Sequence, residues 1–159
     1  MKLFLLSVFS LLTSFAIAHP HSADSIHFDY TFHKSEHMDK VIQVNASITN
    51  QSSKHFYFLS ESCNGLDYYI TTTALNASVY IFVHCNATFP RKITLAPGAS
   101  YEFKTNIKYH STLKKMGLNL VLTQLSEAYQ VDEKFISNIN RDLKKNHLKL
   151  SGPVLIVPQ

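Results

Sequence analysis

The residues best suited to hold a metal ion are histidines, of which the chain has nine in 159 residues. Neutral imidazole is the commonest protein ligand for transition metals. His27 and His33 fall on the same side of a predicted strand, but six residues of extended chain separate them by about 20 Å. They cannot share one ion, so we interpret them as exposed polar residues on a strand.

A more specific copper hypothesis rests on the sequence His19-Pro20-His21, where the mature chain is expected to begin. An N-terminal histidine offers both its amine and its ring to the same copper ion. A copper site built on the third residue would need the backbone N–H of the second residue, which Pro20 lacks. His84 and His110 are the candidate partners that would complete a site with His19 and His21. Because most of the histidines fall on outer strand faces or in loops, we expect copper to bind weakly.

Two cysteines, Cys63 and Cys85, are the only thiols. If the chain is exported, both reach an oxidising compartment and are expected to form a disulfide. Their α-carbons should then lie about 4.4 to 6.8 Å apart. In the chain-entropy model, closing a loop of this length stabilises a fold by about 3 kcal/mol.

Four N-glycosylation sequons are present, each an asparagine followed two residues later by Ser or Thr. We expect all four asparagines on outward strand positions or in loops, where a glycan would fit. The sites would be used in a eukaryotic secretory path and would have no meaning in a bacterium. They are Asn45, Asn50, Asn76 and Asn86.

Motifs of the common enzyme classes are absent from the sequence: there is no G-x-S-x-G, no H-E-x-x-H and no P-loop. The acidic residues are scattered singly, so no carboxylate pair is set up for acid–base chemistry. The cations are nearly all lysines, with only Arg91 and Arg141 able to make forked contacts, which argues against nucleic-acid binding. We therefore expect a non-enzymatic protein that needs no cofactor, copper being the alternative.

The N-terminal residues 1–18 have the order of a secretory signal peptide. Lys2 precedes an apolar stretch from Leu3 to Phe15, and small residues at Ala16 and Ala18 favour cleavage before His19. The apolar stretch is too short for a permanent membrane anchor. We expect a secreted or periplasmic protein without a membrane anchor, with residues 19–159 forming one domain.

Alternation of apolar and polar residues predicts strands over 26–33, 41–49 and 101–109. Shorter strands are expected over 55–60, 67–72, 78–85, 93–95 and 118–125, with a broken, buried strand over 148–157. A helix is expected from Asp132, an N-cap, through Phe135, Ile139 and Leu143. One inner face is consistent with the three long strands: Phe28, Tyr30, Phe32, Ile42, Val44, Ile48, Phe103 and Ile107.

These strands and turns predict a mainly β fold, an antiparallel immunoglobulin-like sandwich with one short helix. The segments VIQVNASITNQSSKHFYFLS and KITLAPGASYEFKTNIKY resemble secreted immunoglobulin-like domains. They are similar in pattern to the bacterial intracellular proteinase inhibitor family and to exported domains of Bacteroidetes type. We expect a binding or interaction module for an unknown protein or surface ligand. The resemblance implies proteinase inhibition as a second alternative, after copper binding.

Overall fold

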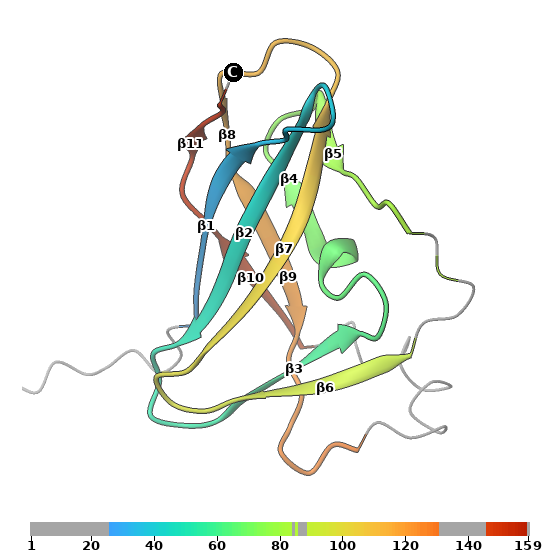
Figure 1. The fold of residues 1–159 in the computed structure, drawn as a ribbon. Coiled ribbons are helices and arrows are strands. Elements are labelled where there is room, and N and C mark those ends of the chain that lie inside the picture. Colours follow the sequence, from blue (N-terminus) through green and yellow to red (C-terminus); the bar gives the residue numbers. More distant parts are fainter. Residues whose placement is uncertain (1–25, 84, 86–88, 131–145, 159) are drawn as a thin grey trace, which may run out of the picture.

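The computed structural model describes residues 26–83, 85, 89–130 and 146–158. This part of the chain is mainly β structure, and every strand pair in it is antiparallel (Figure 1). The helix expected from Asp132 falls within residues 131–145 and so lies outside the described residues. Within them the helical structure is one 3-10 turn, η1 (Asp67–Tyr69), and no helix is long and apolar enough to cross a membrane.

The largest sheet has the strand order β1-β2-β7-β5. It comprises β1 (Ile26–Lys34), β2 (Val41–Asn50), β7 (Ser100–Tyr109) and β5 (Ala77–Val79). The three long strands are those whose alternation the sequence shows most clearly, because every second side chain enters the core. The Pro97-Gly98 turn precedes β7, with Gly98 at a φ of 75° that glycine adopts without strain.

The remaining strands form three smaller sheets. A three-stranded sheet has the order β10-β9-β4, with β10 (His147–Ser151), β9 (Leu118–Thr123) and β4 (Ile70–Thr72). Two strand pairs complete the set: β3 (Phe56–Glu61) with β6 (Pro90–Leu95), and β8 (Lys115–Met116) with β11 (Leu155–Ile156). In Figure 1, β9 and β10 pass behind β1 and β2, and the β3–β6 pair crosses below them.

The main hydrophobic core of the described residues takes side chains from both larger sheets and from the β3–β6 pair. Ile48 and Val44 enter it from β2, and Leu118 and Leu120 enter it from β9, all of them fully buried. The predicted inner face is confirmed: six of its eight residues are buried, while Phe32 and Phe103 are partly buried and packed against the same core. The residues predicted to face outward are exposed: His27, Asp29, Gln43 and Lys104.

Tyr30 joins β1 to the C-terminal part of the chain. Its hydroxyl accepts a hydrogen bond from the backbone N–H of Leu118 at 2.8 Å and donates one to the carbonyl of Pro153. Gly152 lies flat against the Tyr30 ring, where a Cβ atom would clash with the ring carbons. The phenol therefore ties strands that are far apart in sequence.

Three strand predictions need correction. The strand expected over 78–85 is only β5, because the chain leaves β7 after Tyr80, whose N–H donates to the Asn106 carbonyl at 2.7 Å. The strand expected over 67–72 begins as η1, and only 70–72 is extended. The terminal strand is not buried throughout: Ile156 is 75% exposed, and Val157 supplies the buried anchor at 1%.

Candidate binding surface at the disulfide loops

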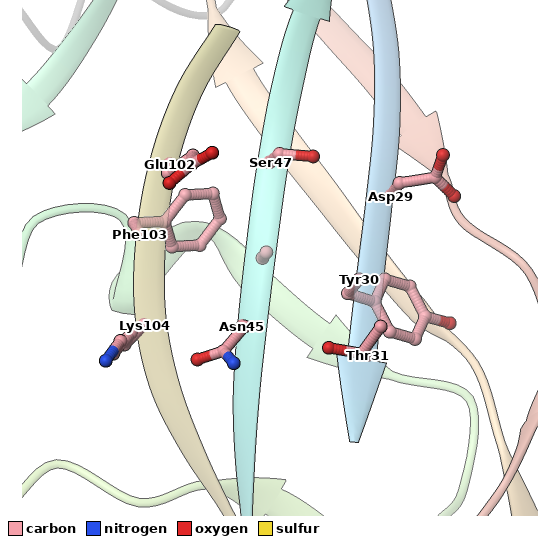
Figure 2. A pocket seen from close by; sticks show the side chains of 9 residues that line it. Asp29, Tyr30, Thr31, Asn45, Ser47, Glu102, Phe103 and Lys104 are labelled. Carbon is pink, nitrogen blue, oxygen red and sulfur yellow. The ribbon is translucent and has the colours of Figure 1, made fainter. Parts of the chain in front are cut away.

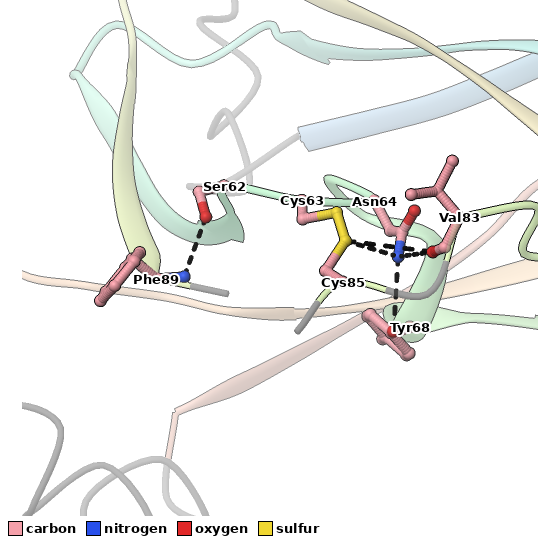
Figure 3. The surroundings of a disulfide bond; sticks show 7 residues. All are labelled: Ser62, Cys63, Asn64, Tyr68, Val83, Cys85 and Phe89. Atoms are coloured by element: carbon pink, nitrogen blue, oxygen red, sulfur yellow. Dashed lines mark hydrogen bonds between the residues drawn. A yellow bond between two sulfur atoms is a disulfide. The ribbon is translucent and has the colours of Figure 1, made fainter. Parts of the chain in front are cut away.

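Two loops meet beside β3 and are joined by a disulfide. Cys63 lies two residues after the end of β3, and Cys85 lies on the segment that runs from β5 toward β6. The two cysteines are bonded, as predicted, with their α-carbons 6.4 Å apart (Figure 3). The bond lies just beyond the end of the β3–β6 pairing, where Glu61 is paired with Pro90.

Hydrogen bonds reinforce the disulfide on both sides. Ser62 holds Phe89 twice: its N–H donates to the Phe89 carbonyl at 2.8 Å, and its hydroxyl accepts from the Phe89 N–H at 2.9 Å. On the other side, the side-chain amide of Asn64 donates to the Val83 carbonyl at 3.0 Å (Figure 3). Asn64 adopts a left-handed φ of 60°, a conformation that asparagine tolerates better than most residues.

Large apolar side chains point into solvent around this junction. Tyr68 is 56% exposed, Phe82 50%, Val83 60% and Phe89 61%. We call these four residues, three aromatic and one valine, the aromatic surface. Asn64 contacts Tyr68 and Val83, and Ser62 contacts Phe89, on either side of the disulfide (Figure 3). Phe82 precedes Val83 in the chain. Exposed apolar residues are ordinary when single, but a group of them marks a contact surface.

Aromatic and cationic contacts hold Tyr80 and Phe82, the residues that lead from β5 into the aromatic surface. The rings of Tyr80 and Phe82 meet edge to face, 4.6 Å between centroids. The Lys108 ammonium lies 5.2 Å above the Tyr80 ring, which favours a cation–π attraction. Lys108 belongs to β7, so the regular sheet supports the start of the irregular segment.

Two half-buried polar groups of η1, Asp67 and Tyr69, lie close to these loops in the sequence. Burial raises the pKa of the Asp67 carboxyl on η1, and the neighbouring Thr105 hydroxyl has a smaller, opposing effect. Burial also raises the pKa of Tyr69, reinforced by Glu61, whose carboxylate accepts a hydrogen bond from the Tyr69 hydroxyl at 2.9 Å. At neutral pH the Tyr69 hydroxyl is therefore a protonated donor that fastens η1 to the end of β3.

A different kind of surface covers the outer side of the β1-β2-β7 strands. Cross-strand pairing aligns polar residues in rows, such as Asp29, Ser47 and Glu102. The rows line an open hollow of about 720 Å³ (Figure 2). The His27 ring nitrogen Nε2 donates to the Asp29 carboxylate at 2.8 Å, so that carboxylate is already paired. The face offers amides, hydroxyls and single charges to solvent.

One of the four proposed copper ligands, His110, belongs to the described residues. His110 is exposed just beyond β7, and its backbone N–H donates to the Asn76 carbonyl. His19, His21 and His84 lie outside the described residues. Among the residues that are described, no three His, Cys, Asp or Glu side chains are close enough to share a metal ion.

The four sequons have different environments, which corrects one expectation. Asn45 is exposed, Asn76 is half-buried with its amide 2.6 Å from the Ser111 hydroxyl, and Asn86 lies outside the described residues. Asn50, expected in an outward turn, is instead wholly buried. Its side-chain amide donates to the carbonyls of Lys54 and Leu95, so it seals the corner where β2 ends.

The sequence alone assigns no function to four residues of these loops: Ser62, Asn64, Phe82 and Phe89. Asn64-Gly65 directly after a cysteine is a turn signal that points to the first loop. Nothing local marks Ser62 and Phe89 as partners, because 26 residues separate them.

Searches against family models and against curated proteins find no match to this chain. The function is therefore argued from the surface itself.

Proposed function

We propose that this protein is an exported, non-enzymatic interaction module with an immunoglobulin-like sandwich fold, and that it binds a protein partner through the aromatic surface. The aromatic surface carries this proposal. Its four members expose at least half of their area to solvent, although apolar groups of this size normally gain about 1.5 to 3 kcal/mol each on burial. A partner that covers them would supply that burial.

Preorganisation supports the same conclusion. A loop that is ordered before binding loses less conformational entropy when the partner arrives. The disulfide and the hydrogen bonds of Ser62 and Asn64 hold these loop residues in place before a partner binds. Aromatic residues at the centre of an interface contribute a large share of the binding free energy.

The other parts of the proposal have separate support. Two antiparallel sheets over one core are the arrangement expected of a sandwich. A disulfide is typical of a secreted or periplasmic compartment, and the N-terminal 18 residues have the order of a signal peptide.

Comparative capture from the extracellular fluid of the source cells tests the proposal. The bait proteins are the wild type, the double variant Phe82→Ser with Phe89→Ser, and a control, Ile156→Ser. Ile156 is a matched control because it is 75% exposed but belongs to β11, away from the disulfide loops (Figure 1).

We expect one protein to be retained by the wild type and the Ile156→Ser control and lost, by at least tenfold, from the double variant. Circular dichroism should show all three baits folded. Equal retention by the three baits, or no specific retention by the wild type, contradicts the proposed surface.

A further inference from the structure

Two sequons on strand β2, five residues apart, have opposite surroundings. The side chain of Asn45 projects from the outer face of the sheet, in register with Thr31 on β1 and Lys104 on β7 (Figure 2). It is exposed and makes no hydrogen bond with another described residue. Ser47, the hydroxyl residue of this sequon, projects from the same face (Figure 2).

Asn50 uses its whole side chain inside the protein. Its amide nitrogen donates two hydrogen bonds, to the Lys54 carbonyl at 2.7 Å and to the Leu95 carbonyl at 2.9 Å. Its amide oxygen accepts from the N–H of Ser52 at 3.0 Å and from the Ser52 hydroxyl at 2.7 Å. The hydroxyl residue of this sequon is thus part of a turn, and the side chain of Asn50 has no exposed area.

We propose that Asn45 carries an N-linked oligosaccharide and that Asn50 in the folded protein does not. A lipid-pyrophosphate-linked oligosaccharide of a eukaryotic secretory pathway is the donor. The Asn45 amide nitrogen forms a bond to the first sugar's anomeric carbon, the bond from that carbon to the pyrophosphate breaks, and the nitrogen gives up one proton.

The same chemistry excludes Asn50. A glycosylated amide nitrogen keeps one hydrogen, whereas Asn50 donates one bond to the buried Leu95 carbonyl and one to the part-buried Lys54 carbonyl. The Lys54 carbonyl also accepts from the Ser52 hydroxyl, but the Leu95 contact is buried, and a buried polar group left unpaired costs about 1 to 3 kcal/mol. The sugar itself would have to occupy space that β2 and the turn before β7 already fill. A chain modified at Asn50 before folding would not reach this structure.

A glycan at Asn45 would also decide which surface stays free. The outer face of β1, β2 and β7 is a plane of amides, hydroxyls and single charges, against which an oligosaccharide can hydrogen-bond. Rooted at the middle strand, the glycan covers this face and leaves the aromatic surface uncovered. The inference rests on the proposed export of the chain but not on the proposed partner.

Site-resolved mass spectrometry of the chain secreted by a eukaryotic host tests the inference. Trypsin cleaves after Lys40 and Lys54, so one peptide, residues 41–54, contains both asparagines. Release of the glycan by an amidase in heavy-oxygen water converts each modified asparagine to labelled aspartate, and fragment ions assign the label. We expect the label at Asn45 and unmodified Asn50.

Two matched variants give an independent measurement. Ser47→Ala removes the Asn45 sequon and Ser52→Ala removes the Asn50 sequon, and neither alters an asparagine. On a denaturing gel, Ser47→Ala should lose the mobility shift of one glycan, whereas Ser52→Ala should keep the wild-type pattern. Asn45→Gln should match Ser47→Ala, which separates loss of the glycan from any effect on folding.

Each remaining outcome overturns the inference. A secreted protein that is unmodified at Asn45, or labelled at Asn50, contradicts it while leaving export intact. A chain that stays in the cytosol and carries no glycan refutes the export on which the inference depends.

Discussion

The β1-β2-β7 sheet and the disulfide loops are built on different principles. In the sheet, backbone pairing is continuous over nine or more residues, apolar side chains face inward and polar ones face outward. In the loops, one covalent bond and a few side-chain hydrogen bonds hold an apolar surface outward. Stability spread over many contacts resists any single change, whereas order that depends on a few links is lost when one link is removed.

The comparison predicts that equal truncations have unequal effects. Ile48 has no exposed area and lies in the core under β2, so Ile48→Ala should lower the free energy of unfolding by about 4 kcal/mol. Phe82→Ala, on the aromatic surface, should change it by no more than about 0.5 kcal/mol. Urea unfolding followed by circular dichroism measures both. Similar losses for the two variants would show that Phe82 belongs to the core.

The disulfide should stabilise the loop segments that contain no strand more than it stabilises the β1-β2-β7 sheet. The double variant Cys63→Ala with Cys85→Ala should lose about 3 kcal/mol of stability. Chymotrypsin should then cut near Tyr80 and Phe82 before it cuts any residue of β1 or β2. Proteolysis with peptide mapping distinguishes the two regions, and reduced wild-type protein is the control. Cleavage that begins in the sheet would contradict the proposed division.

The two asparagines of β2 allow the comparison to be made within one strand. Asn50→Ala removes two donated bonds, one to the buried Leu95 carbonyl and one to the part-buried Lys54 carbonyl, and should cost about 2 kcal/mol. Asn45→Ala removes an exposed side chain and should lie within about 0.5 kcal/mol of the wild type. Unglycosylated protein from a bacterial host is the right material, with thermal unfolding as the measurement. Equal effects of the two variants would contradict the assigned role of Asn50.

Asp67 links the two regions, because η1 brings its carboxyl toward Thr105 of β7. Its pKa is raised in the folded state above the ordinary value of 3.8. The neutral carboxyl is therefore favoured on folding, and its contribution to stability is full below pH 3.8 and lost as the pH rises through the folded pKa. Asp67→Asn should be more stable than the wild type at neutral pH, with the difference shrinking as the solution is acidified. Unfolding curves across this pH range test the sign, and a difference that grows in acid would reverse it.

Copper binding should give the smallest measurable effect of these predictions, in the sheet and in the disulfide loops alike. Calorimetric titration of the protein that begins at His19 should show weak binding, unchanged by His19→Ala. A dissociation constant below micromolar would contradict this prediction if the binding were also abolished by one extra residue before His19. That extra residue converts the terminal amine of His19 to an amide and so removes a copper ligand.

The sequence predicts the regular region well because its signal is local. Alternation in β1, β2 and β7 identifies the inner face residue by residue, and the same alternation places Asn50 inward, since it follows Val44 and Ile48 at even spacing. The composition of the turn, rich in Asn and Ser, obscured that signal. The aromatic surface was not predictable in the same way, because Ser62 meets Phe89, and Asn64 meets Val83, only after the chain has folded. The two cysteines were the one long-range clue.

Tyr30 has a consequence for the order of folding. Its hydroxyl contacts Leu118 and Pro153, which lie 88 and 123 residues further along the chain. Contacts of such separation are slow to form, because a long loop must close before they provide any stabilisation. During synthesis, β1 leaves the ribosome first and must wait for the residues around Gly152 before its last partner exists. Until then the apolar face of β1 that carries Tyr30 is exposed, so a chaperone that binds apolar strands would bind β1 at this stage.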